Sequence, residues 1–283
     1  MRSQQRNFSM RHWFITGLSS GLGRALAIAA LDTGDAVSGT VRSVEAQRSF
    51  NSMHATKASA FMADVTDHDA VAAAVAGAEL QNGGIDILVN NAGFSFLGTL
   101  EEAEWPDLRA QYETNLFGPI AAFKAALPGM RAKRKGLIIN VSSSAAHTTG
   151  GGVGFYSSTK MALEGLSKSL SHELAPFGIK VMIAVPGAYR TDLGLNRKTP
   201  VETIADYAEQ NAVRGAFLSK LSGQQRGDPR KAAAVILDAV NANAIPFYLP
   251  LGPDAVESIT KNLSLVSEDV KSWETQARST DLD

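Results

Sequence analysis

Short apolar segments alternate with helix-length segments along nearly the whole chain, and this alternation limits the possible folds more than any other feature. The apolar segments have few polar interruptions, as strands need when helices cover both faces of their sheet. We expect strands at residues 12–16, 36–41, 58–63, 85–90, 136–142, 179–185 and 245–252.

The intervening segments predict helices at residues 24–34, 67–82, 115–131 and 157–175, and two more that start at Asp228 and Asp254. Right-handed crossovers then give an α/β fold with three layers, α/β/α: a Rossmann-type, doubly wound parallel sheet of about seven strands flanked by helices. Without a repeat or linker, we expect one domain at 12–283 after a flexible tail at 1–11. It includes a weakly patterned substrate loop at about 188–227 and a C-terminal helical extension at about 254–283.

Composition excludes several classes of function. The 283 residues are 45% apolar, enough for a sizeable core, and the net charge of −1 offers no basic field for nucleic acid or an anionic membrane. The absence of cysteine removes disulfides and thiolate catalysis, and the five histidines lack metal-ligand spacing, so we expect no metal site. With a polar start and no apolar run of about 18 residues, the chain is expected to be cytoplasmic, without a membrane partner.

A glycine-rich segment, TGLSSGLG at residues 16–23, stands between the first expected strand and the first helix. Glycines there let the backbone approach a pyrophosphate at the helix N-terminus, where its charge is stabilised. The spacing alone suits an ordinary turn equally well, but its position favours a dinucleotide site. The candidate binding residues are Gly17, Ser19, Ser20, Gly21, Leu22 and Gly23.

The end of the second expected strand indicates which dinucleotide binds. It reads SGTVRS, with Val41 where a carboxylate would hydrogen-bond the ribose of NAD, followed by Arg42. A guanidinium can hold the 2′-phosphate of NADP by charge-assisted hydrogen bonds. We therefore expect NADP(H); the alternative is that Arg42 only faces solvent and the cofactor is NAD.

Tyr156 and Lys160 are four residues apart on an expected helix, so they lie on one face. A phenol has an ordinary pKa near 10, and an ammonium group within about 4–6 Å lowers it. We expect Lys160 to lower the pKa of Tyr156 and thereby to ease proton exchange with a carbonyl oxygen. By itself, the pair would equally suit a helix surface.

Seven motifs in order resemble those of the short-chain dehydrogenase/reductase family, over roughly residues 12–251. They are TGLSSGLG (16–23), DVT (64–66), NNAG (90–93), Asn115 in ETNLFG, NVSS (140–143), YSSTK (156–160) and PGAYRT (186–191). The resemblance implies catalytic roles for Asn115, Ser143, Tyr156 and Lys160. Ser143 is preferred to Ser142 because the family serine usually precedes the tyrosine by 13 residues. The resemblance adds Asp64, Val65, Asn91, Ala92, Gly93, Tyr156, Lys160, Pro186, Gly187 and Thr191 to the cofactor site.

The expected function is that of an NADP(H)-dependent oxidoreductase. It interconverts a carbonyl and a secondary alcohol by hydride transfer, with tyrosine as proton donor or acceptor. The expected substrate is a small, apolar carbonyl or alcohol compound, and the resemblance implies homodimers or homotetramers formed through the two long helices. The alternatives are an NAD-dependent alcohol dehydrogenase, a non-catalytic NADP-sensing protein and a sugar-nucleotide epimerase or dehydratase. The TGxxxGxG spacing argues against the last.

Overall fold

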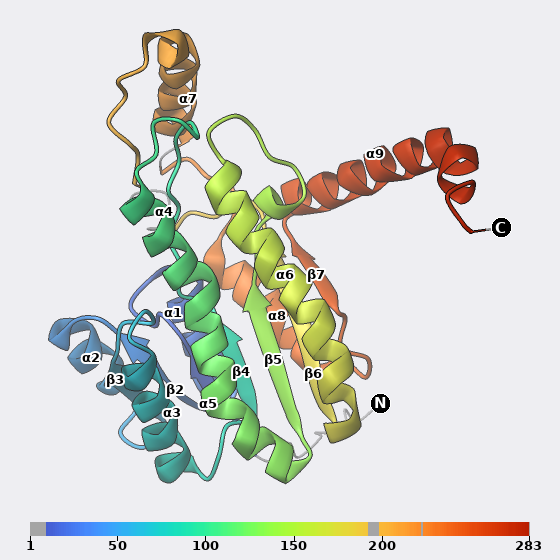
Figure 1. The fold of residues 1–283 in the computed structure, drawn as a ribbon. Helices are drawn as coiled ribbons and strands as arrows, with labels where there is room; N and C mark the ends of the chain where they lie inside the picture. Colours follow the sequence, from blue (N-terminus) through green and yellow to red (C-terminus); the bar gives the residue numbers. More distant parts are fainter. Residues whose placement is uncertain (1–9, 192–197, 222, 283) are drawn as a thin grey trace, which may run out of the picture.

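A computed structural model describes residues 10–191, 198–221 and 223–282. Its described residues form a seven-stranded parallel sheet in the order β3-β2-β1-β4-β5-β6-β7 (Figure 1). The strands are β1 (His12–Ile15), β2 (Ala36–Val41), β3 (Ala58–Met62), β4 (Ile87–Asn90), β5 (Gly136–Val141), β6 (Ile179–Pro186) and β7 (Tyr248–Leu251). This confirms the predicted doubly wound α/β fold.

Helices cover both faces of the sheet. One face packs against α1 (Gly21–Asp32) and α8 (Pro229–Asn241), with Phe50 of α2 (Val44–Asn51) at its margin. The other face packs against α3 (His68–Asn82), α5 (Gly118–Lys133) and α6 (Gly154–Leu174). The short helix α4 (Trp105–Tyr112) precedes α5.

Strand β1 shows how the sequence produces these layers. Trp13 and Ile15 enter the core beneath α1 and α8, whereas Phe14 enters the core beneath α3 and α5. All three side chains are fully buried. Successive strand residues point to opposite faces, so a strand covered on both sides must be apolar at every position. Each burial contributes about 1.5–3 kcal/mol.

Several boundaries differ from the sequence prediction. The helix expected from Asn115 is interrupted, because Glu113–Phe117 forms a π-helical turn, η1, and α5 begins at Gly118. Helix α2 was not predicted, and α6 starts at Gly154 rather than Ser157. The expected strand at 85–90 is paired as β4 only from Ile87. Such boundary errors arise because tertiary contacts decide where an element ends.

The predicted flexible tail at 1–11 lies largely outside the described residues. Its last member, Arg11, is anchored, contrary to that prediction. The backbone N–H and Nε of Arg11 donate to the Asp35 carboxylate at 3.0 and 2.9 Å, and Trp13 Nε1 donates to the same carboxylate. Asp35 is buried, so these bonds replace the water that its charge has lost.

The substrate loop expected at 188–227 carries a short 3₁₀ turn, Ala205–Tyr207, and helix α7 (Ala208–Leu221); residues 192–197 and 222 lie outside the described part. The C-terminal extension forms α9 (Pro253–Arg278), which projects away from the body in Figure 1. In the described part of the chain, no helix combines the length and apolar character needed to cross a membrane.

Candidate active site

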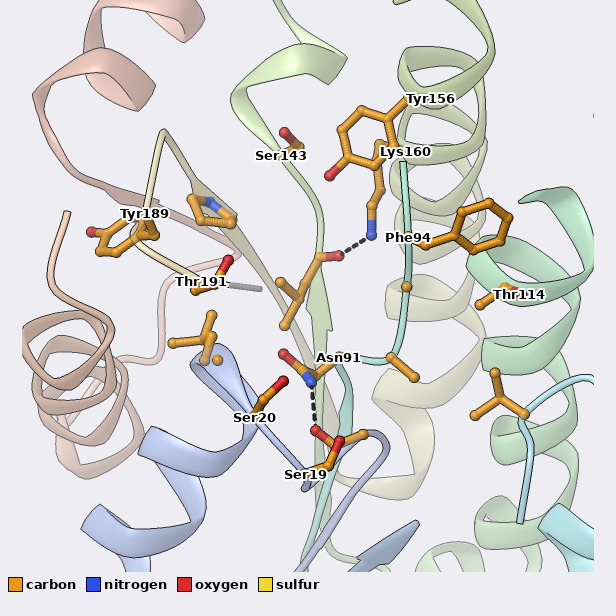
Figure 2. Close-up of a pocket in the computed structure, with 18 of the residues that line it drawn as sticks. Ser19, Ser20, Asn91, Phe94, Thr114, Ser143, Tyr156, Lys160, Tyr189 and Thr191 are labelled. Carbon is orange, nitrogen blue, oxygen red and sulfur yellow. Dashed lines mark hydrogen bonds between the residues drawn. The ribbon is translucent and has the colours of Figure 1, made fainter. Parts of the chain in front are cut away.

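A cavity of about 550 Å³ opens at the carboxyl ends of β1, β2, β4, β5 and β6. The strand order reverses between β1 and β4, and a crevice forms at such a point because the two connections leave to opposite faces. On the β2 side the cavity is lined by Arg42 and Asp64, and towards β5 by Ser143, Tyr156 and Lys160. Figure 2 shows the labelled part of this lining.

The glycine-rich loop forms the wall beside β1 and is held by the segment after β4. Asn91 Nδ2 donates to the carbonyl oxygens of Thr16 and Gly17 at 3.0 and 3.2 Å. The Thr16 hydroxyl accepts from the backbone N–H groups of Asn91 and Ala92 at 3.0 Å each. The NNAG motif thus holds the glycine-rich loop in position, in addition to lining the cavity.

Gly23 shows why this loop needs glycine at a close approach. A Cβ atom at Gly23 would lie 2.4 Å from both Asn91 Nδ2 and the Gly17 carbonyl oxygen. Gly17 also has φ +77°, in the left-handed region that glycine adopts without strain. Gly23 itself does not line the cavity. Its close packing holds the loop in place, and its role as a binding residue stays a prediction.

The N-terminus of α1 faces the cavity through Ser20, Gly21 and Leu22. Ser20 stands at the N-cap, but its side chain makes no capping hydrogen bond, and the first turn carries no acidic residue. The first backbone N–H groups of a helix have no partners within the helix, and its dipole attracts negative charge. This end of α1 can therefore receive an anion.

Arg42 and Asp64 follow β2 and β3 and form an ion pair at the cavity edge, with 3.8 Å between Nη1 and Oδ2. The Arg42 side chain is 79% exposed and that of Asp64 45%, so the attraction is screened by water. The other carboxylate oxygen of Asp64 accepts from the N–H and hydroxyl of Thr66 at 3.0 and 2.9 Å. Asp64 is thereby oriented, whereas Arg42 stays accessible to another anion.

The two serines that follow β5 have different surroundings. Ser142 is buried, and its hydroxyl donates to Glu164 Oε1 at 2.5 Å. Ser143 Oγ accepts from the backbone N–H of Ala145 at 3.2 Å and lines the cavity beside Tyr156. In Figure 2 the Tyr156 hydroxyl points towards Ser143. Of the two, Ser143 is the serine whose hydroxyl faces the cavity, where it can donate to a bound group.

Lys160 lies one helical turn after Tyr156 on α6, as predicted, and is buried. Its Nζ donates to the Val141 carbonyl oxygen at 2.8 Å and lies 5.9 Å from the centre of the Tyr156 ring (Figure 2). Burial lowers the pKa of Lys160 to about 8, although the Glu164 carboxylate opposes this change. Lys160 therefore remains mostly charged at neutral pH.

The pKa of Tyr156 differs from the prediction that Lys160 lowers it. Burial raises this pKa above its ordinary value, and only the hydrogen bond with the Ser143 side chain opposes the rise. The phenolate would be charged, and taking charge out of water disfavours it. Tyr156 is consequently a phenol at neutral pH, the form that can donate a proton.

Asn115 lies behind the cavity rather than in its lining. Its Oδ1 accepts from the Phe94 N–H at 3.1 Å, and its Nδ2 donates to the Phe94 carbonyl and to Thr159 Oγ1 at 3.0 and 3.1 Å. The π-helical turn carries this side chain inwards, and such turns are frequent at functional sites. Asn115 thus joins the chain after β4 to α6.

The cavity lining includes every predicted site residue other than Gly23 and Asn115. It also contains Phe94 and several residues that were not predicted from the sequence, among them Thr40, Thr114, Lys198 and Gln225. Thr40 Oγ1 accepts from the Gly17 N–H at 3.1 Å, and Lys198 Nζ stands 5.4 Å from the centre of the Phe94 ring. Tyr189, in the PGAYRT motif, also lies in the lining.

A buried polar cluster surrounds Glu164, next to Ser143, and was not predicted from the sequence. Glu164, one turn beyond Lys160, accepts from Ser142 and from the Tyr248 hydroxyl, the latter at 3.1 Å. His147 Nε2 is 3.2 Å from Glu164 Oε1, without the geometry of a hydrogen bond. The i,i+4 spacing from Lys160 was the available signal for Glu164. His147, four residues after Ser143, belongs to this cluster.

Comparisons with known proteins agree with this geometry. The family model for short chain dehydrogenases matches residues 11–201. An oxidoreductase of Botryotinia fuckeliana is 37% identical over 266 residues, covering 92% of this chain and 96% of its own. A 3-ketodihydrosphingosine reductase of Bacteroides thetaiotaomicron is 36% identical, covering 84% and 87%. A 3-oxoacyl-[acyl-carrier-protein] reductase of Vibrio cholerae is 32% identical, covering 78% and 86%.

Solved structures show the same relationship. A short-chain dehydrogenase from Streptomyces avermitilis is 40% identical with a TM-score of 0.89, covering 98% of this chain and 100% of its own. One from Burkholderia cenocepacia, in complex with NADP, is 25% identical with a TM-score of 0.72, covering 93% and 97%. One from Burkholderia phymatum, in complex with NAD, shares the fold at 21% identity and a TM-score of 0.78, covering 92% and 96%. The chain belongs to the short-chain dehydrogenase/reductase family of oxidoreductases.

Proposed function

We propose that this protein is an NADP(H)-dependent reductase that interconverts a carbonyl compound and a secondary alcohol. The observation that carries this proposal is the gathering of Ser143, Tyr156 and Lys160 in a cavity that also holds the N-terminus of α1 and Arg42. When bound, NADPH supplies the hydride. The chain supplies the binding site, the orientation and the proton.

The chain's residues fit the nucleotide. The uncapped N-terminus of α1 suits its pyrophosphate, and Asn91 keeps the glycine loop in position. Arg42 is exposed on the β2 side, where charge-assisted hydrogen bonds would hold a 2′-phosphate. The nearby Asp64 would repel that phosphate in part, so NAD remains the second candidate cofactor. The NADP bound in the Burkholderia cenocepacia structure supports NADP(H) as the first candidate cofactor.

The substrate carbonyl would bind between Ser143 and Tyr156. The Ser143 hydroxyl donates a hydrogen bond to the oxygen as negative charge develops on it. Tyr156 then gives its proton to that oxygen, and its raised pKa means that the proton is present at neutral pH. The Lys160 ammonium stabilises the phenolate that this transfer leaves. Asn115 keeps α6 in place against the chain after β4.

The substrate is proposed to be an apolar carbonyl compound. Phe94 and Tyr189 line the cavity with Tyr156, which supports an apolar ligand. The names of two relatives describe the reduction of a 3-keto or 3-oxo group, so the first compounds to screen are 3-oxo esters and long-chain ketones. A non-catalytic sensor would need neither Ser143 nor Tyr156.

Fluorescence titration with NADPH and NADH tests the cofactor, in the wild type and in Arg42→Ala. An Arg–phosphate contact contributes about 1.5–3 kcal/mol, so the substitution should weaken NADPH binding roughly 10- to 150-fold and leave NADH nearly unchanged. Arg48→Ala, which removes an exposed arginine outside the cavity lining, is the control. Equal loss for both nucleotides, or preferred binding of NADH, would overturn the assignment to NADP.

A further inference from the structure

The C-terminal helix α9 carries an apolar seam whose outer part nothing in the described structure covers. The seam consists of Val256, Ile259, Leu263, Val266, Val270, Trp273 and Ala277, whose spacings alternate between three and four residues. This is the a/d spacing of a coiled coil, repeated over three heptads. Such a repeat places all seven side chains along one stripe of the helix.

Ile259 packs against the core beside β6, and exposure shows that beyond it the seam is unpartnered within the described residues. Leu263, Val266, Val270 and Trp273 are 54–66% exposed, and every described residue after Asn262 is exposed. The base of α9 is anchored, because Ala255 is buried against β6 and the Ser258 hydroxyl donates to the Ser144 carbonyl at 2.8 Å. Beyond it the helix extends alone from the body (Figure 1). An isolated helical segment of this length is marginal in water, so the outer part needs a partner.

We propose that the seam of α9 pairs with the same seam of a second copy of this chain, in antiparallel orientation. The apolar area of the exposed seam side chains is on the order of 500 Å² per copy, so two copies would bury about 1,000 Å², enough for a specific interface. A continuous apolar patch of about 500 Å² matches the largest patch on a typical monomer, and such patches are often functional. An antiparallel pair also closes with two-fold symmetry.

The charges beside the seam favour antiparallel pairing. In a parallel pair, Asp269 of one helix would face Glu274 of the other, and these two carboxylates repel each other. In an antiparallel pair that stacks Leu263 on Val266 and Val256 on Trp273 of the second copy, Asp269 faces the neutral Asn262. The charges thus favour the antiparallel orientation.

Other occupants fit less well. The helix carries five carboxylates against three basic side chains, which is unlike the basic amphipathic helices that bind anionic membranes. The segment 1–9 of the same chain reads MRSQQRNFS, and its two large apolar residues cannot cover three heptads. A second copy, in contrast, offers a seam of identical length and apolar character.

The test measures the mass of the full chain in solution by sedimentation and light scattering over a range of concentrations. Val270→Glu puts a carboxylate in the seam, and Thr275→Glu puts one on the opposite, exposed face of the same helix as the matched control. We expect Val270→Glu to raise the dissociation constant of the assembly at least 100-fold, with Thr275→Glu close to wild type. A wild-type tetramer that becomes a dimer only in Val270→Glu would support the proposal equally.

Two results would overturn it: a wild type that is monomeric at about 100 μM with its helical circular dichroism intact, or an assembly that Val270→Glu leaves unchanged. An assembly that Val270→Glu leaves unchanged would point instead to pairing through α5 and α6. Because the chain has no cysteine, disulfide trapping can test the orientation. A mixture of Asn262→Cys and Asp269→Cys should cross-link, and cross-linking of Asp269→Cys only with Glu274→Cys would contradict the antiparallel arrangement.

Discussion

Replacing Glu164 by glutamine should lower the pKa of Lys160, because Glu164 is the charge that keeps this buried lysine protonated. Both side chains are buried, and they lie one turn apart on α6. Burial alone favours the neutral amine, whereas the Glu164 carboxylate favours the ammonium, and together they leave the pKa at about 8. Glutamine has nearly the same shape but removes the opposing charge.

The size of the effect follows from the distance between the two charges. Side chains one turn apart are separated by roughly 6 Å, and with an effective dielectric constant of ~20 the attraction is about 3 kcal/mol. This energy corresponds to about two pH units, an upper limit because the Glu164 charge is also shared with Ser142 and Tyr248. We therefore expect the pKa of Lys160 to fall by about one to two units. The charged fraction at pH 7.5 would then drop roughly three- to twenty-fold.

The assay follows Lys160 by NMR with ¹³C-labelled lysine, so it needs no knowledge of the substrate. The titratable groups that face the cluster are His147, Tyr156 and Tyr248, and His147 should be titrated in parallel because it lies beside the same carboxylate. Glu173→Gln, which removes an exposed carboxylate from the same helix, is the control and should leave Lys160 unchanged. A folded Glu164→Gln protein whose Lys160 pKa stays near 8 would refute the reasoning.

Three further predictions follow from the site. Tyr156→Phe should reduce carbonyl reduction at least 100-fold with NADPH binding nearly unchanged, and appreciable residual turnover in a coupled absorbance assay would contradict the proposed proton donor. Gly23→Ala should weaken nucleotide binding and lower Tm, since its Cβ would clash at 2.4 Å, whereas Gly165→Ala on α6 has open space and should raise stability by about 1 kcal/mol in thermal unfolding. Glu102 accepts hydrogen bonds from the backbone N–H groups of Thr203 and Ile204. The hydrogen bonds to this carboxylate lower its pKa to about 2, and the bond from the Thr99 side chain has the largest effect. A lowered carboxyl pKa stabilises the folded chain above the unfolded value near 4.3, and this stabilisation is lost as the pH falls towards the folded value. The hydrogen-exchange protection of the amides at 203–211, relative to their intrinsic exchange rate at each pH, should therefore decrease between about pH 4.5 and 2; unchanged protection would count against this anchor.

Much of this architecture is determined by the sequence itself. Local periodicity sets the strands and helices, because a strand covered on both faces must be apolar throughout, as Trp13, Phe14 and Ile15 are. The four-residue spacing of Tyr156 and Lys160 places them one turn apart on any helix. The glycine loop between a strand and a helix likewise follows from residue order alone. These features depend on neighbours in the chain, which the sequence displays directly.

Other features were decided only by the tertiary structure. The sequence could not reveal that burial raises the pKa of Tyr156, because desolvation depends on everything packed around the hydroxyl. Nor could it show that Ser142 is held by Glu164, that Arg42 pairs with Asp64, or that a π-helical turn carries Asn115 inwards. The heptads of α9 are written in the sequence, but only the fold shows that the body leaves them uncovered. Exposure and charge environment are properties of residues distant in the chain, and folding alone brings those residues together.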